Sequence, residues 1–236
     1  MKKLVLITGS STGIGFSALK KFVDNKHNVL AHYFEETEAF TNYVESNENV
    51  TKIYSDFGDD QSLKDFLKTI SNYNDFLALV NCAGCLDFSK RENERINGAR
   101  KVFQINTIAA TLIAEEIFNK MKAQKMGNII NISSIGVKFG SDIQNVFYGA
   151  SKSALESVTR SYSRAGAPFN VLVNTLRPGI TDTEFYQKIG KDLTNRIKLI
   201  PMKRAARPNE IAEMIYFLAV KNTFISGEVI SVTGGE

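Results

Sequence analysis

The chain has 236 residues, 43% of them hydrophobic, so it can bury the core of a single globular domain. Its 29 basic and 25 acidic side chains leave a net charge of +4 and are spread along the sequence, which argues against a nucleic-acid-binding surface. Its apolar stretches are too short for a membrane span or a secretory signal, and Cys82 and Cys85 lack partner ligands for a disulfide framework or a metal site, so we expect a reduced, cytoplasmic compartment.

Short apolar runs alternate with helical patterns along the whole chain. The runs that predict strands are 3–8, 28–34, 50–56, 76–82, 128–133, 170–176 and 228–232, and those that predict helices include 15–25, 61–71, 99–125, 148–164 and 209–220. This alternation predicts an α/β fold, a doubly wound parallel sheet of about seven strands in one domain that spans residues 1–236. In such sheets ligands bind beyond the carboxyl ends of the strands, so we expect the functional residues there.

A glycine-rich turn, T8-G-S-S-T-G-I-G15, follows the first strand and leads into the first helix. Its glycines, Gly9, Gly13 and Gly15, would let the backbone and a helix N-terminus approach a pyrophosphate. A plain Gly/Ser/Thr turn is the alternative. The position between the first strand and the first helix favours a dinucleotide-phosphate loop.

Polar residues also follow the third and fourth strands. Asp56 and the segment N81-C-A-G84 could contact an adenine ring and its ribose. Asp56 could equally cap the next helix, and Asn81 could satisfy a turn. The sequence leaves both alternatives open.

The fifth and sixth strands end in I132-S-S-I135 and R177-P-G-I-T-D-T183. Ser133 and Ser134 place hydroxyl groups at the sheet edge, where they could also be ordinary capping residues. Pro178 cannot continue a strand ladder, so the backbone after it could hold a carboxamide.

Tyr148 and Lys152 are four residues apart in a predicted helix, which places a phenol beside an ammonium. A positive charge roughly 5 Å from a phenolate would lower a tyrosine pKa by about two units, enough for proton exchange near neutral pH. A packed ring beside a solvated amine would give the same spacing by chance. The pair becomes informative through the motifs around it.

Together, T8-G-x-x-x-G-x-G15, N81-C-A-G84, Asn106, S133-S134, Y148-x-x-x-K152 and P178-G179 resemble the short-chain dehydrogenase/reductase family of the compact single-domain type, which has a Rossmann-like fold. The resemblance covers nearly the whole chain and implies an NAD(P)-dependent oxidoreductase that acts on a carbonyl or secondary alcohol, with 3-oxoacyl reduction as one substrate class. It implies that Tyr148 is the general acid/base, that Lys152 lowers the tyrosine pKa and binds the nicotinamide ribose, and that Ser134 orients the substrate. Asn106 would complete a proton relay through a helix irregularity and a water.

The resemblance also implies which residues contact the dinucleotide. They are Gly9, Ser11, Thr12, Gly13, Ile14, Gly15, His32, Tyr33, Asp56, Phe57, Asn81, Ala83, Gly84, Tyr148, Lys152, Pro178, Gly179, Ile180 and Thr183.

Two positions depart from the family pattern. Cys82 replaces an asparagine, and we interpret it as a small buried thiol without a chemical role. His32 stands near the position where NAD-preferring members carry an acid, and with Tyr33 it could line a 2′-phosphate pocket, which favours NADP. Thr12 stands where many NADP users have a basic residue, so NAD stays an alternative.

For substrate and assembly, the resemblance implies an apolar pocket under a short lid at about residues 181–203, and a homotetramer or homodimer. The basic residues of the lid are typical of a solvated helix and could also attract an anionic substrate. The alternative function is a catalytically silent dinucleotide sensor or scaffold of the same fold. Such proteins usually lose the tyrosine or lysine, and this chain retains both, which favours the enzyme.

Overall fold

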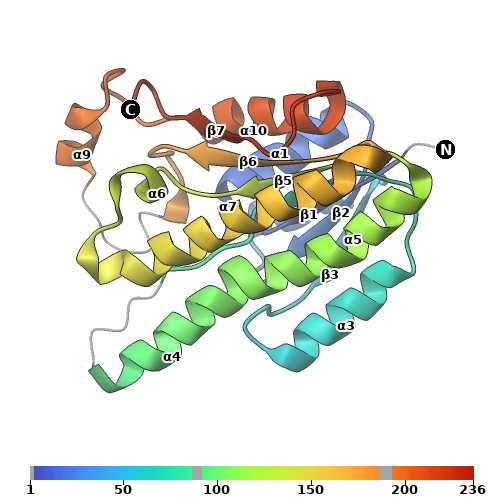
Figure 1. Cartoon of the computed structure of the whole chain (residues 1–236), viewed down its shortest axis with the longest axis horizontal. Helices are drawn as coiled ribbons and strands as arrows, with labels where there is room; N and C mark the ends of the chain where they lie inside the picture. Colours follow the sequence, from blue (N-terminus) through green and yellow to red (C-terminus); the bar gives the residue numbers. More distant parts are fainter. Residues whose placement is uncertain (1–2, 87–91, 186–192) are drawn as a thin grey trace.

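The computed structural model describes residues 3–86, 92–185 and 193–236 (Figure 1). Seven parallel strands form one sheet in the order β3-β2-β1-β4-β5-β6-β7. The strands are β1 (Leu4–Thr8), β2 (Asn28–Tyr33), β3 (Val50–Tyr54), β4 (Phe76–Asn81), β5 (Gly127–Ile132), β6 (Val171–Pro178) and β7 (Val229–Val232). The predicted doubly wound sheet is confirmed.

Helices cover both faces of the sheet. The helices are α1 (Gly13–Asp24), α2 (Glu38–Glu45), α3 (Asp60–Ser71), α4 (Glu92–Phe103), α5 (Ala110–Gln124), α6 (Gly136–Phe139), α7 (Val146–Gly166), α9 (Thr194–Leu199) and α10 (Pro208–Tyr216). Figure 1 shows α1 and α10 together on one face, and α3, α5 and α7 on the other. Among the described residues, no helix is long and apolar enough to cross a membrane.

Each face of the sheet has its own hydrophobic core. Under α1 and α10 the core includes Phe22, Phe40 and Ile215, and under α3 and α5 it includes Phe66 and Ile113. All five side chains are fully buried. Full burial of one such side chain stabilises the fold by about 1.5–3 kcal/mol. These two layers therefore hold the helices on the sheet and fix the positions of the strand ends.

The structure differs from the predicted elements in several places, one of which is the helix predicted over 209–220, which ends at Tyr216 and continues as a π-helical segment, Phe217–Lys221. The sequence prediction missed α2, although Thr37 caps it by accepting a hydrogen bond from the backbone of Phe40 (3.2 Å). The single helix predicted over 99–125 begins earlier, at Glu92, and is interrupted by a π-helical segment, Gln104–Ala109. A π-helical turn admits an extra residue, so the side chains around it change face, and the apolar periodicity alone does not reveal it.

The strand order reverses between β1 and β4. From β1 the chain proceeds to β2 and β3 on one side, and then returns to β4 and continues to β7 on the other. Connections from these two strands leave in opposite directions, so a crevice opens beyond their carboxyl ends. The glycine-rich turn after β1 and the segment after β4 meet there.

Candidate active site

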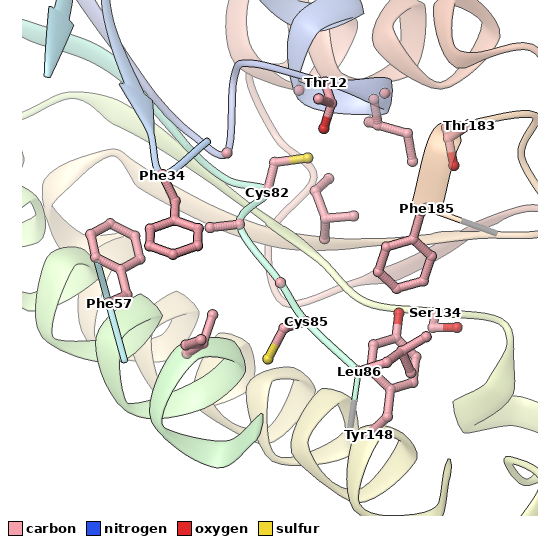
Figure 2. A pocket seen from close by; sticks show the side chains of 18 of the residues that line it. Thr12, Phe34, Phe57, Cys82, Cys85, Leu86, Ser134, Tyr148, Thr183 and Phe185 are labelled. Carbon is pink, nitrogen blue, oxygen red and sulfur yellow. The ribbon is translucent and has the colours of Figure 1, made fainter. Parts of the chain in front are cut away.

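A cavity of about 520 Å³ lies along the carboxyl ends of the strands. Figure 2 shows Phe34 and Phe57 at one end of it, and Ser134, Tyr148 and Phe185 at the other. Seventeen of the predicted site residues line it: Gly9, Ser11, Thr12, Gly13, Ile14, Gly15, His32, Asp56, Phe57, Ala83, Gly84, Ser134, Tyr148, Lys152, Pro178, Gly179 and Thr183.

The turn after β1 is locked against the end of β4. Gly9 has a φ of +67°, and a Cβ there would lie 2.8 Å from the Cα of Ala83, so only glycine fits without strain. The hydroxyl of Thr8 accepts hydrogen bonds from the backbone N–H groups of Cys82 (3.0 Å) and Ala83 (3.1 Å). In the described structure no side chain caps the N-terminus of α1 after Thr12. The first-turn N–H groups of α1 are therefore available to an anion in the cavity.

His32 holds this turn from the other side. Its Nδ1 accepts a hydrogen bond from the Gly9 N–H (3.0 Å), and its Nε2 donates to the Ser55 carbonyl (3.1 Å). The ring stacks on Phe57 with centroids 3.9 Å apart, and burial lowers its pKa to about 4. A neutral ring with both nitrogens engaged has no donor left for a phosphate, so His32 lines the cavity without a free donor for a 2′-phosphate.

Three other predicted cofactor contacts lie outside the cavity lining. Tyr33 follows His32 in the strand and therefore faces the opposite side of the sheet, where it packs on Phe40 (5.4 Å between centroids). Asn81 directs its Nδ2 to the side chain of Asn131 (2.9 Å), inside the sheet. Ile180 is buried, with an exposed fraction of 8%. In each case the sequence position was near a strand end, but the direction of the side chain depends on the strand register.

Other lining residues were not among the predicted catalytic or cofactor-binding residues, although Thr181 and Phe185 belong to the apolar substrate pocket predicted under the lid. The cavity is also lined by Phe34, Glu35, Ser55, Cys82, Cys85, Leu86, Gly98, Lys101, Val102, Ile105, Ile132, Ser133, Thr181, Glu184 and Phe185. Phe34 and Glu35 come just after β2, and this position is a signal that could have identified them. Lys101, Val102 and Ile105 belong to α4 and the π-helical segment; they fall within the helix predicted over 99–125, but its apolar pattern did not show that this side of it lines the cavity.

Lys152 is buried beside Tyr148 on α7. Its Nζ lies 5.9 Å from the centroid of the Tyr148 ring and donates a hydrogen bond to the carbonyl of Ile132 (2.8 Å). Burial lowers the pKa of Lys152 to about 8, and the thiols of Cys82 and Cys85 raise it in part. A buried cation one turn from a phenol is the arrangement that the four-residue spacing predicted.

Ser134 lies at the same end of the cavity as Tyr148 (Figure 2). Its hydroxyl accepts a hydrogen bond from the Gly136 N–H (3.2 Å), which leaves its own hydrogen free to be donated. Phe185 packs over the site, with its ring centroid 6.4 Å from that of Tyr148. Two hydroxyl groups under an apolar cover can hold a polar substrate atom away from water.

Asn106 lies in the π-helical segment, where a helix irregularity was expected, but its side chain does not line the cavity. Its Oδ1 accepts from the Cys85 N–H (2.8 Å), and its Nδ2 donates to the Cys85 carbonyl (3.0 Å) and to Ser151 (3.0 Å). The hydroxyl of Ser151 in turn donates to the carbonyl of Tyr148 (2.8 Å). The amide thus ties the segment after β4 to α7, and a proton relay at Asn106 would have to run through its backbone.

The thiol of Cys82 reaches the cavity, and burial raises its pKa to about 11. In Figure 2 the side chains of Cys82 and Cys85 point in different directions. A protonated thiol is a poor nucleophile, so the geometry gives no reason to assign a chemical role to Cys82.

Part of the predicted lid lies outside the described residues, including Tyr186, Lys188, Ile189 and Lys191. Of the remainder, Thr181 forms an isolated bridge with Ala206, and α9 carries Arg196 and Lys198.

A glycine turn at the switch point of a parallel sheet, with a tyrosine, a buried lysine and a serine at the far end of one cavity, defines a dinucleotide-binding α/β enzyme. A family model described as enoyl-(acyl carrier protein) reductase matches residues 9–236. The chain belongs to the short-chain dehydrogenase/reductase family and is an NAD(P)-dependent oxidoreductase.

Individual relatives agree with this assignment. The chain is 29% identical over 240 residues to the 3-oxoacyl-[acyl-carrier-protein] reductase FabG of Aquifex aeolicus (99% of this chain, 96% of the relative). It is 31% identical over 245 residues to a 3alpha-hydroxysteroid dehydrogenase of Mediterraneibacter gnavus (98% and 96%). Among solved structures, ElxO with NADP bound superposes with a TM-score of 0.86 at 28% identity (100% of this chain, 98% of that chain).

Proposed function

We propose that the protein reduces the carbonyl of a 3-oxoacyl-type substrate, with NADPH as the hydride donor and Tyr148 as the proton donor. The observation that carries the proposal is the pairing of Tyr148 with buried Lys152 at the same end of the cavity as Ser134. The Aquifex aeolicus relative is a 3-oxoacyl-[acyl-carrier-protein] reductase, which supports the 3-oxoacyl class. The steroid class of the other relative is less favoured, because the expected lid is short.

The residues present suit a bound dinucleotide. The turn at Gly9 and Gly13 and the uncapped first turn of α1 would hold the pyrophosphate. Asp56 and Phe57 would contact the adenosine, and the turn after Pro178 would contact the carboxamide. When bound, the reduced nicotinamide supplies the hydride that attacks the carbonyl carbon.

The protein side of the reaction is proton donation to the carbonyl oxygen. As that oxygen gains negative charge, Tyr148 transfers the phenolic proton to it and the Ser134 hydroxyl donates a hydrogen bond. Lys152 stabilises the phenolate through its positive charge. One of its hydrogens is bound to the carbonyl of Ile132, and two remain for the ribose and the phenol side. In the reverse direction the same groups would oxidise an alcohol.

The choice of NADP over NAD rests on the lack of an acid within the end of β2 and on the NADP-bound ElxO neighbour. Glu35 lines the cavity just after β2, and its negative charge opposes the binding of a 2′-phosphate, whereas the positive charge of Lys101 from α4, which lines the same cavity, favours it.

Titration of the protein with NADPH and with NADH measures which dinucleotide binds more tightly. We expect tighter binding of NADPH, and the Glu35→Gln variant should raise the NADPH preference further by about threefold to tenfold. A preference of the wild type for NADH would overturn the choice.

A screen of 3-oxoacyl thioesters, simple ketones and hydroxysteroids with both reduced cofactors tests the substrate class. We expect the highest kcat/KM for a 3-oxoacyl thioester. Dinucleotide binding without turnover of any carbonyl or alcohol would instead support the sensor alternative. The cytoplasmic compartment, the lid over residues 181–203 and the homotetramer or homodimer stay predictions.

A further inference from the structure

Glu156 is a buried carboxylate on the catalytic helix α7, one turn after Lys152. Its exposed fraction is 5%. Its Oε1 accepts hydrogen bonds from the hydroxyl of Ser133 (2.7 Å) and from Nε of Arg177 (3.0 Å), and its Oε2 accepts from Nη2 of Arg177 (2.7 Å). One carboxylate therefore connects α7 to the ends of both β5 and β6.

One partner of Glu156, Ser133, precedes the predicted catalytic serine, and the other, Arg177, precedes Pro178 on the neighbouring strand. The Ser133 N–H donates to the carbonyl just before Arg177 (2.8 Å), and the Ile135 N–H donates to the carbonyl of Pro178 (2.9 Å). In the register that pairs Ile132 with Leu176, Ser133 lies opposite Arg177 and Ser134 lies opposite Pro178, between two hydrogen bonds that join the ends of β5 and β6. A shift of Arg177 relative to α7 would move both Ser134 and the turn after Pro178.

A buried ion pair is weak evidence of stabilisation by itself. The loss of hydration of both charges offsets most of their attraction, and a well-packed apolar pair of similar size is often as stable. The pKa of Lys152 is lowered by burial and raised in part by the thiols of Cys82 and Cys85, and Glu156 is not among the causes of its shift. The contacts of Glu156 thus point to the geometry of the site rather than to its charge balance.

We propose that Glu156 is a positioning residue for the reaction. Through Ser133 it holds the end of β5, which carries Ser134, and through Arg177 it holds the end of β6, which leads into the turn at Gly179. The inference rests on the proposed function, since it assigns an effect on carbonyl reduction.

The double variant Glu156→Leu/Arg177→Leu tests the proposal, because it removes both charges together and leaves no unpaired ion in the core. We expect it to fold and to bind dinucleotide with an affinity within about threefold of the wild type, since the turn after β1 is untouched. Its kcat should fall by at least about tenfold, because a small displacement of Ser134 or of the turn removes the alignment of the reacting groups. Its KM and the pH profile of kcat should change little.

Two single variants complete the test. Glu156→Gln keeps the size and an acceptor oxygen, so its kcat should lie between those of the wild type and the double variant, and it serves also if the double variant does not fold. Glu213→Gln is the matched control, because Glu213 forms an exposed ion pair with Lys21 at the α1–α10 contact, outside the cavity lining. It should keep the wild-type kcat.

Each outcome separates the hypotheses. If the wild type reduces a carbonyl substrate and the double variant keeps the same kcat, the positioning role is overturned. A kcat that falls only in proportion to the number of dinucleotide-binding sites, measured by titration, also overturns it, since this indicates partial unfolding. A wild type that reduces no carbonyl overturns the proposed function and this inference with it.

Discussion

Tyr148 and Lys152 face one cavity from the same side of α7, and the lysine is held by the carbonyl of Ile132. This geometry leads to a direct prediction at the residue scale. Tyr148→Phe removes the proton donor but keeps the ring, so kcat should fall by about 10²–10⁴-fold while dinucleotide affinity stays nearly unchanged. Steady-state kinetics and a fluorescence titration with NADPH check this. A variant that kept the wild-type kcat on a true substrate would contradict the role of Tyr148.

His32 gives a second prediction, on stability. Its pKa is about 4 in the folded protein and 6.5 ordinarily, so between these values the unfolded chain binds a proton that the folded protein does not. The free energy of unfolding should therefore fall as the pH decreases from 6.5 to 4, by about 3 kcal/mol from this group.

The substitution His32→Gln isolates this effect, because an amide can offer one acceptor and one donor without titrating in this range. Urea unfolding at several pH values between 4 and 7 should show a smaller pH dependence for the variant than for the wild type. Equal pH dependence in both proteins would mean that His32 is not the responsible group.

At the scale of elements, the site depends on how closely the turn after β1 approaches α1. A Cβ on Gly15 would lie 2.0 Å from the carbonyl oxygen of Gly9. Gly15→Ala should therefore displace the turn, lower the free energy of unfolding by roughly 1–3 kcal/mol and weaken dinucleotide binding by more than about tenfold.

Gly140→Ala is a matched control for this prediction. Gly140 is the residue that ends α6, and a Cβ there would meet nothing within 4 Å, although its φ of +84° carries some strain. The control should keep its dinucleotide affinity. If both variants bound dinucleotide like the wild type, the turn would not be the phosphate site.

At the scale of the whole molecule, a chain of buried polar side chains joins β4, β5, α7 and β6. Asn131 accepts from Asn81 (2.9 Å) and donates to Thr159 (2.8 Å), whose hydroxyl is 2.7 Å from that of Thr175. Inside a sheet such groups have no water to replace a lost partner, so each contact is costly to break.

Asn131→Ala should therefore lower the free energy of unfolding by about 2–3 kcal/mol, because it removes a buried hydrogen-bond partner from both Asn81 and Thr159. Urea denaturation measures the loss. Dinucleotide affinity should change by less than about threefold, since Asn131 lies outside the cavity lining. A stability equal to that of the wild type would contradict the importance of this network.

The alternation of apolar runs and helical patterns determined the fold class, because strand and helix periods are local properties of the chain. The spacing of Tyr148 and Lys152 determined their common helix face for the same reason, and the glycine turn was recognisable from its position after the first strand. The tertiary structure decided which way each side chain points and which residues it contacts. His32 and Tyr33 are adjacent in sequence, yet the register of β2 sends them to opposite faces of the sheet, so of the two only His32 lines the cavity, and its ring nitrogens are already hydrogen-bonded.

The partners of Glu156 were equally beyond the sequence. Ser133 and Arg177 are 23 and 21 residues away from it along the chain, and no local pattern records that two strand ends meet one helix turn. Local periodicity therefore determined which residues reach the edge of the sheet. Long-range packing alone decided which of them face the cavity, and which hold the others in place.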